Sequence, residues 1–318
     1  MARILAACMG ALIALAAGAQ DYPSRTLHIV VPFAAGGAVD TVARIVGQRL
    51  SEQMKTPVIV ENKPGADANI GATVVAKSAP DGYTVLLGAN GLTTNGTLFK
   101  NLQYDTLRDF APVARVGYAP LVLVVPTASP LRSLRELIEA GRKDAGKLTY
   151  GSAGTGGSGH LASELLKSSA KFEALHVPYK GGAPALTDLV GERLSFMLIN
   201  PLEAVPHVKG NRLRALAVSS DKRLALLPDA PTFAEAGLPG YQASVWWGFV
   251  APARTPPGIV KRLSDETLRA LEDAAVRNKL EALGAVVAPL PSAQFGEFLA
   301  SETRTWAGVI RKAGIHAN

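Results

Sequence analysis

The chain has 318 residues, of which 48% are hydrophobic, 19% charged and 6% aromatic, and its formal net charge is +7. This length suits two domains of roughly 120–150 residues each, with enough apolar material for packed cores. The positive charge forms no dense run of lysine and arginine, which argues against a nucleic-acid-binding protein and leaves open a field that attracts anionic ligands.

The N-terminal segment has the pattern of an export signal. Met1–Arg3 is a short positively charged start, Ile4–Ala17 is apolar and uncharged, and Ala17–Ala19 is a small-x-small cleavage signal. We therefore expect a cleaved signal peptide over residues 1–19 and a periplasmic protein. An uncleaved anchor and lipidation at Cys8 are the alternatives. Because Cys8 is the only cysteine, the mature chain is expected to lack disulfides, a thiol nucleophile and a cysteine metal site.

The first part of the mature chain alternates strands and helices. Apolar strands are expected at 27–31, 58–60 and 84–88, and helices with apolar residues at helical spacing at 38–53 and 69–77. The first strand leads into helix 38–53 through a glycine-rich turn, Phe33–Gly37. This alternation predicts an α/β protein with mostly parallel sheet.

The same pattern recurs about 120 residues later, an offset that suits a second lobe facing the first. A strand at 148–151 enters a second glycine-rich turn, Ser152–Gly159, and a helix at 160–168 follows. Ser133 is expected to cap a helix at 133–143, with Glu136 completing a capping box. The other predicted strands are 121–125, 175–179, 194–199, 213–218 and 241–250, and the other helices are 182–190, 256–273, 274–283 and 292–313.

The order of these segments predicts that the chain crosses from one lobe to the other and back. The first lobe is expected to comprise 20–120 plus 245–318, and the second 121–244. Hinges are expected near 116–121 and 241–248.

Both glycine-rich turns fall where strands of an open sheet end, which is where such folds bind ligands. Glycine lets backbone amides approach a ligand, and a helix N-terminus offers unpaired N–H groups with partial positive charge. Such a site holds a carboxylate or phosphate without a side-chain cation. Gly154, Gly156 and Gly159 fit a dinucleotide fingerprint only in a forced frame, and no P-loop motif is present. We expect no cofactor.

Sequence motifs for catalysis are absent. The five histidines (28, 160, 176, 207 and 316) show no metal-binding spacing, and no Gly-x-Ser-x-Gly elbow follows a strand. We therefore expect no catalytic residue and no metal site.

Several residues near the turns could either serve the fold or contact a ligand. Asp40 can cap its helix, His160 can make a local hydrogen bond, and Lys180 can be solvated. One of the adjacent Trp246 and Trp247 should lie in the core and the other at the cleft, because neighbouring strand residues face opposite ways. Asn90 and Thr93, after the strand at 84–88, can serve a turn or the ligand's far end.

A series of motifs along residues 22–315 closely resembles the substrate-binding receptors of tripartite tricarboxylate transporters, the Bug family of periplasmic proteins. The matching motifs are Tyr22–Pro23, Val31–Asp40, Glu61–Ala66, Ala79–Thr84, Tyr150–Gly154, His160–Ala162, Val177–Leu189, Leu213–Val218 and Pro228–Thr232.

The resemblance implies a two-lobed type II periplasmic-binding-protein fold, an α/β architecture with a ligand cleft between the lobes. It also implies a small organic carboxylate ligand gripped mainly by backbone amides, transporter membrane subunits as partners, and no enzymatic activity. A monomer is expected. A receptor acting with a sensor kinase and a periplasmic enzyme on a related fold are the alternatives.

The ligand-binding residues expected on these grounds belong to the two turns, the strand ends and the aromatic segment. They are Phe33, Ala34, Ala35, Gly36, Gly37, Asp40, Asn90, Thr93, Ser152, Gly154, Thr155, Gly156, Gly157, His160, Tyr179, Lys180, Asn200 and Trp246. One departure is the pair Ile199-Asn200, because family members commonly carry Asp-Asn there. Its lack of an acid weakens an amino-acid ligand.

Overall fold

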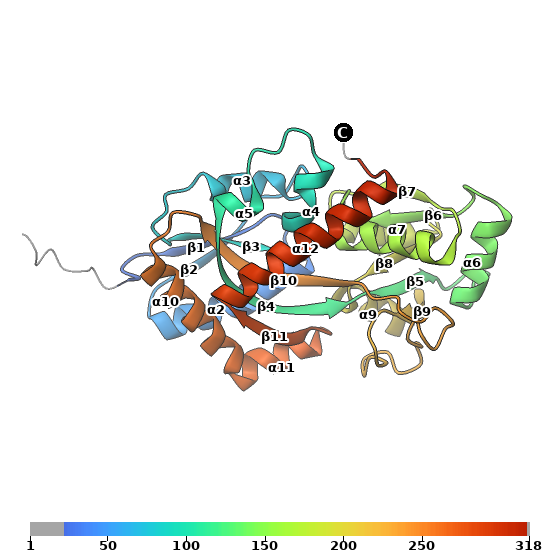
Figure 1. The fold of residues 1–318 in the computed structure, drawn as a ribbon. Helices are drawn as coiled ribbons and strands as arrows, with labels where there is room; N and C mark the ends of the chain where they lie inside the picture. The colour runs from blue at the N-terminus through green and yellow to red at the C-terminus, as the bar shows by residue number, and fades with distance from the viewer. Residues whose placement is uncertain (1–21, 317–318) are drawn as a thin grey trace, which may run out of the picture.

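The computed structural model describes residues 22–316, so the predicted signal peptide and Cys8 lie outside the described residues. Two separate sheets, each with helices packed on it, form two lobes that lie side by side (Figure 1). No helix among residues 22–316 is both long enough and apolar enough to cross a membrane.

The first lobe is built on a six-stranded sheet of order β11-β4-β10-β3-β1-β2. Strands β1, β2 and β3 are parallel, whereas β10 runs antiparallel to β3 and β4. Its strands are β1 (Leu27–Val31), β2 (Val58–Asn62), β3 (Thr84–Gly88), β4 (Phe110–Pro120), β10 (Ser244–Pro252) and β11 (Val286–Pro291). Its helices are α2 (Ala38–Met54), α3 (Asn69–Ala76), α4 (Gly91–Leu98), α5 (Thr106–Asp109), α10 (Pro257–Glu272), α11 (Ala274–Ala282) and α12 (Ser292–Ala313).

The second lobe is built on a five-stranded sheet of order β7-β6-β8-β5-β9. Here β6 is parallel to β7 and β8, and β5 is antiparallel to β8 and β9. Its strands are β5 (Val122–Pro126), β6 (Thr149–Ser152), β7 (Leu175–Pro178), β8 (Phe196–Ile199) and β9 (Leu213–Val218). Its helices are α6 (Leu134–Lys143), α7 (Ser158–Ala170), α8 (Gly182–Val190) and α9 (Pro201–Lys209).

Two strands and one helix link the lobes. Strands β4 and β10 pair from Phe110–Pro252 at one end to Pro120–Ser244 at the other, and the chain enters and leaves the second sheet there. Helix α12 runs from the first lobe across to α7 of the second (Figure 1). The lobe boundaries and hinges predicted from the sequence stay predictions, and β4 and β10 are where such a hinge would act.

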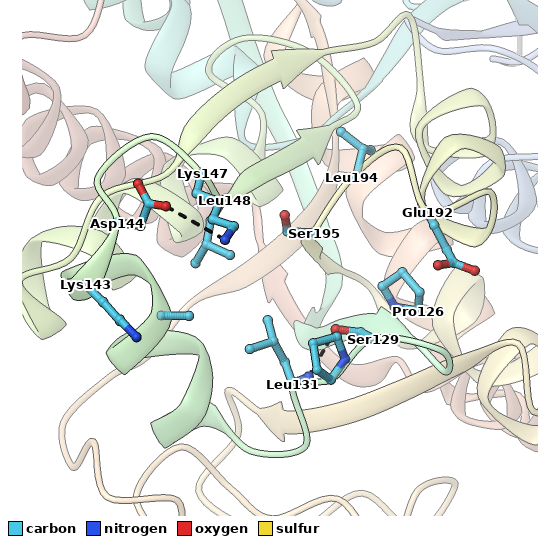
Figure 2. Close-up of a pocket in the computed structure, with 12 residues that line it drawn as sticks. Pro126, Ser129, Leu131, Lys143, Asp144, Lys147, Leu148, Glu192, Leu194 and Ser195 are labelled. Carbon is cyan, nitrogen blue, oxygen red and sulfur yellow. Dashed lines mark hydrogen bonds and ion pairs between the residues drawn. The ribbon is translucent and has the colours of Figure 1, made fainter.

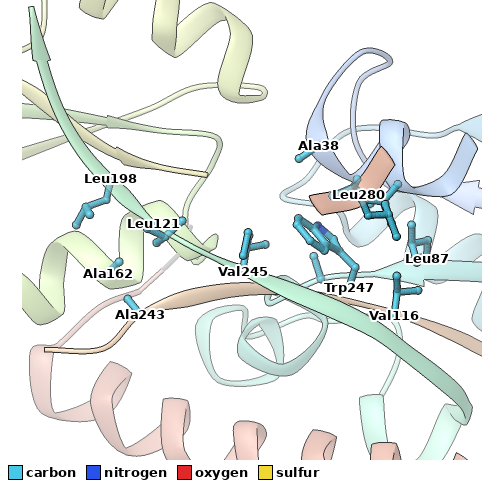
Figure 3. Packing of buried hydrophobic residues seen from close by; sticks show 14 of the residues in the cluster. Ala38, Leu87, Val116, Leu121, Ala162, Leu198, Ala243, Val245, Trp247 and Leu280 are labelled. Carbon is cyan, nitrogen blue, oxygen red and sulfur yellow. The ribbon is translucent and has the colours of Figure 1, made fainter. Parts of the chain in front are cut away.

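The main hydrophobic cluster contains residues of both lobes: Leu87 and Val116 from the first sheet, Leu198 from the second, and Leu121 from the junction between β4 and β5 (Figure 3). Trp247 of β10 packs in this cluster. Each fully buried leucine or valine stabilises the fold by about 1.5–3 kcal/mol. A shared core of this kind keeps the strand ends of the two sheets close to one another.

The regular elements predicted from hydrophobic periodicity are confirmed, with ends that differ by a few residues. The Ser133 cap is confirmed because its Oγ accepts from the Glu136 N–H at 3.2 Å, but the Glu136 carboxylate accepts from Arg132 N rather than from Ser133 N. The sequence analysis missed α4, α5, β4, α9 and β11. Helix α4 is rich in Gly, Thr and Asn, and α9 contains Pro206, so local propensity alone favours neither helix.

Candidate functional site

A cavity of about 130 Å³ lies between the two lobes and is lined by both. Phe33, Ala35 and Trp247 line it from the first lobe, and Thr155 and Asn200 line it from the second. It is well below the about 300–1,000 Å³ of sites for drug-sized ligands. The site therefore suits a small solute.

Five helices begin at this cavity. The first residues of α2, α4, α7, α8 and α9, or the residues just before them, are among those that line it. Four of these helices have no side chain capping their first turn, α9 being the exception. In α4 the N–H groups of Leu92 and Thr93 already donate to Ala89 O and Asn90 O, so α4 offers fewer free N–H groups than α2, α7 and α8. The free N–H groups and the helix dipoles give the cavity a positive potential at its walls. This arrangement favours an anion.

The first glycine-rich turn is held by a buried aspartate. Gly36 has the left-handed φ of 82° that glycine adopts readily, and its N–H donates to Asp40 at 2.9 Å. Arg44 and Asn62 also donate to the same carboxylate. Burial would raise the pKa of Asp40, but these hydrogen bonds outweigh burial and hold that pKa below its ordinary value. Asp40 therefore braces the turn and does not line the cavity.

The second glycine-rich turn repeats this geometry with a histidine. Gly156 has a φ of 81°, and its N–H donates to His160 Nδ1 at 2.9 Å. Because Nδ1 accepts, the imidazole is neutral with its proton on Nε2. The ring stacks on His176 at 3.8 Å. Burial lowers the pKa of His160 to about 4, with a smaller contribution from Lys167.

Ser152 and His176 form a second support under this turn. Ser152 Oγ lies 2.7 Å from His176 Nε2 and donates to Gly154 O at 2.8 Å. Burial, followed by the neighbouring His160, lowers the pKa of His176 to about 3. A histidine with so low a pKa is a poor general base. Ser152 is buried and does not line the cavity, so this pair serves the turn.

The cavity lining holds two acids and, among the described residues, no lysine, arginine or histidine. Asp67 reaches from the first lobe to the second, where its Oδ1 accepts from Thr155 N at 3.0 Å. A Cβ at Gly154 would overlap this oxygen, so glycine permits the contact. Burial raises the pKa of Asp67, although the Thr155 N–H opposes that rise. Glu203 lies at the start of α9, and burial raises its pKa to about 7.

Trp246 and Trp247 face opposite sides of their strand, as strand geometry requires. The prediction that Trp246 contacts the ligand is wrong, because Trp247 is the one at the cavity. Trp246 is buried on the far face of β10, packed edge-on against Phe295 and Phe298. Trp247 lines the cavity together with Val245. The Trp247 Nε1–H is buried without a hydrogen-bond partner among the described residues.

The structure brings half of the expected ligand-binding residues to the cavity. Phe33, Ala34, Ala35, Gly37, Asn90, Gly154, Thr155, Gly157 and Asn200 line it. Asn90 also ties α4 to β10, since its side chain donates to Ser244 O and accepts from Trp246 N.

The other half lies behind the cavity or outside it. Gly36, Asp40, Ser152, Gly156 and His160 shape the two turns. Thr93 is buried and donates to Asn90 O, Tyr179 donates to Asp188, and Lys180 is exposed.

Sequence reasoning missed several residues that line the cavity, notably Asp67, Gly182, Glu203 and Trp247. The acid expected of the family at position 199 is absent, but Glu203 supplies one four residues later. The available signal for Glu203 was its position two residues after Pro201, in the first turn of a helix. An acid after such a proline normally indicates only the start of a helix.

A larger cavity of about 520 Å³ lies at the outer end of the second lobe, beside Lys143, Lys147, Leu131 and Glu192 (Figure 2). It is open to solvent and lined by one lobe only. No group of His, Cys, Asp and Glu that could hold a metal is found within residues 22–316.

Two α/β lobes around an anion-receiving cavity define a solute-binding protein of the two-lobed periplasmic-binding-protein fold. The family model described as "Tripartite tricarboxylate transporter family receptor" matches residues 42–315. The chain belongs to this family.

BugT of Bordetella pertussis is 36% identical over 304 residues, which cover 95% of this chain and 93% of BugT. The R. palustris protein solved with adipate has a TM-score of 0.89 and 35% identity, over 93% of this chain and 99% of that one. MatC from Rhodopseudomonas palustris, solved with malate, has a TM-score of 0.84 and 34% identity, over 91% and 100%.

Proposed function

We propose that this chain is an exported periplasmic receptor that captures a small organic carboxylate and passes it to the membrane subunits of a tripartite tricarboxylate transporter. The observation that carries this proposal is the meeting of five helix N-termini at a small cavity whose lining, within residues 22–316, contains no basic side chain. Related proteins solved with adipate and malate support the ligand class. The predicted signal peptide at 1–19 supports the location.

The ligand is proposed to bridge the lobes. One carboxylate would accept from the uncapped first turn of α2, and the opposite part of the ligand would meet α7 or α8. A ligand that contacts both lobes binds the closed state more tightly than the open state. This difference in affinity drives closure. The hinge is proposed at β4 and β10, and the chain is proposed to act as a monomer.

We also propose that binding occurs without chemical turnover. The Ser152–His176 contact lies outside the cavity and its histidine is a weak base. Ser158 lines the cavity, but His160 on the same helix uses its Nδ1 to accept from Gly156. The site thus holds backbone donors suited to binding rather than an activated nucleophile.

A thermal-shift screen of residues 20–318 tests the proposal. Malate, adipate, tricarboxylates and aromatic acids would each be compared with the matching amide, which has similar shape and no charge. A ligand that binds only the folded state raises the melting temperature. We expect a rise with at least one acid and none with its amide. Equal rises, or a rise with neither in protein freed of carried-over ligand, would contradict the proposal.

A further inference from the structure

The cavity contains a carboxylate of its own at the position of Glu203. Asn200 Nδ2 donates to Glu203 Oε2 at 2.7 Å, and the Glu203 N–H lies 3.4 Å from Asn200 Oδ1. Glu203 Oε1 has no hydrogen-bond partner among residues 22–316, and Glu203 lines the cavity. One oxygen is therefore anchored and the other is available to a ligand.

This free oxygen lies between two helix N-termini. A Cβ added to Gly182, at the start of α8, would be 2.5 Å from Glu203 Oε1, and one added to Gly37, before α2, would be 4.0 Å from it. A ligand carboxylate held by the first turn of α2 would consequently approach Glu203 Oε1. Two carboxylates in contact within a poorly solvated site cannot both remain ionised.

Among residues 22–316, the cavity lining holds no cation that would relieve this repulsion. Asp67 is the other titratable residue at the cavity, and α8 and the α2 turn present glycines toward Glu203. Asp40 behind the α2 turn is already neutralised by Arg44. On α9 itself, burial and Arg212 lower the pKa of His207, so that histidine is neutral at pH 7. Lys180, just before α8, is exposed and does not line the cavity.

We infer that ligand capture takes up a proton at Glu203, whose carboxyl then donates its O–H to the incoming carboxylate. This inference rests on the proposed function and adds a determinant of specificity to it. The proton comes from solvent, and no bond other than O–H is made. Near neutral pH the free carboxyl is already partly protonated, because burial raises the pKa of Glu203 to about 7. The site therefore selects carboxylates that can accept from this group and binds them more tightly at lower pH.

Calorimetric titration of residues 20–318 with adipate and with malate tests the inference. At about pH 8, the heat measured in buffers of different ionisation enthalpy reports the protons taken up. We expect about 0.9 proton per ligand at that pH, and affinity that weakens about tenfold per pH unit above pH 8. The Glu203→Gln variant keeps a donor but cannot titrate. Its proton uptake should fall to near zero, and its affinity at about pH 8 should approach that of the wild type at about pH 6.

Glu297→Gln, an exposed change on α12, is the matched control and should retain the full uptake. Binding of either acid to the wild type with no proton uptake would overturn the inference while leaving the proposed function intact. Uptake that persists in Glu203→Gln would overturn it as well. Failure of every acid in the thermal-shift panel, adipate and malate included, to bind at any pH would remove the proposed function together with the inference.

Discussion

The two glycine-rich turns reach the same backbone geometry by different chemistry. In both, a glycine with φ near 80° precedes a helix, and its N–H donates to the residue four positions later. The first lobe uses ionised Asp40, whose charge is matched by Arg44. The second uses neutral His160, which stacks on His176. The shared element is the uncapped helix start that both turns present to the cavity.

The difference teaches that the side chain that holds each turn, Asp40 or His160, is separable from the amides that form the binding surface. Either acceptor satisfies the glycine N–H, while the amides that face the cavity remain available. The braces also respond to pH differently, because Asp40 stays ionised well below neutrality whereas histidine protonation removes the acceptor. A substitution in one turn can therefore be compared with the substitution at the equivalent position of the other turn.

The largest effect is expected from Asp40→Ala. It would leave Arg44, Asn62 and the Gly36 N–H without their common acceptor, at a cost of about 3 kcal/mol in the free energy of unfolding. Urea denaturation measures this loss. Asp265→Ala, which removes a surface ion pair with Lys261, is the control and should cost less than about 1 kcal/mol. An equal loss of unfolding free energy in the two variants would show that Asp40 does not hold the turn in place.

The next effect is expected from placing a β-branched side chain at each helix start. Gly37 and Gly157 both have negative φ, and a Cβ meets nothing closer than 3.5 Å at either position. Gly37→Val and Gly157→Val should therefore fold, yet each should weaken carboxylate binding about 100-fold, near 2.7 kcal/mol, by covering the amides. Calorimetry measures the affinity.

Gly156→Val is the informative contrast to that pair. Its φ is left-handed and a Cβ there would overlap Leu98, so it should lose stability as well as binding. If Gly157→Val bound ligand normally, the second turn would be excluded from the site.

A smaller effect is expected from acidification. The folded-state pKa values of His160 and His176, about 4 and about 3, lie below the ordinary 6.5. The unfolded chain therefore binds more protons below about pH 6.5, and stability falls as the pH drops, by on the order of 1 kcal/mol per histidine between about pH 6.5 and 5.5. Denaturation at several pH values measures the slope. His160→Leu should flatten it, and the exposed His316→Gln should not. An unchanged slope in His160→Leu would contradict the assignment.

The smallest effect is expected from Asp67→Ala, which removes the hydrogen bond from Thr155 N across the lobes. We expect a loss of about 1 kcal/mol in stability and a more open average separation of the lobes. Small-angle scattering measures the separation. Scattering identical to the wild type, with and without ligand, would show that this contact does not hold the lobes together.

Much of this site was predictable from sequence because it is made of backbone. Glycine-rich turns between a strand and an amphipathic helix identify where amides are exposed, and both turns were found in this way. The side chains that line the rest of the cavity follow no such pattern. Ala66, Asp67 and Ala68 all have positive φ, a conformation that nothing in their identity signals.

The tryptophans and Glu203 illustrate two further limits of prediction from sequence. The alternation of Trp246 and Trp247 was evident, but the face that each occupies depends on sheet register, and β10 has an irregularity directly after Trp247. Glu203 looks like an acid that favours a helix start. Only the approach of α2 and α8 places it in the cavity.

A crystal structure of residues 20–318 with bound adipate or malate would test the central claim most directly. We predict a carboxylate between the lobes, within about 2.7–3.2 Å of first-turn N–H groups of α2 and of α7 or α8, with no lysine or arginine in contact. A ligand held by Lys180, or by Lys143 and Lys147 in the outer cavity of Figure 2, would contradict the account.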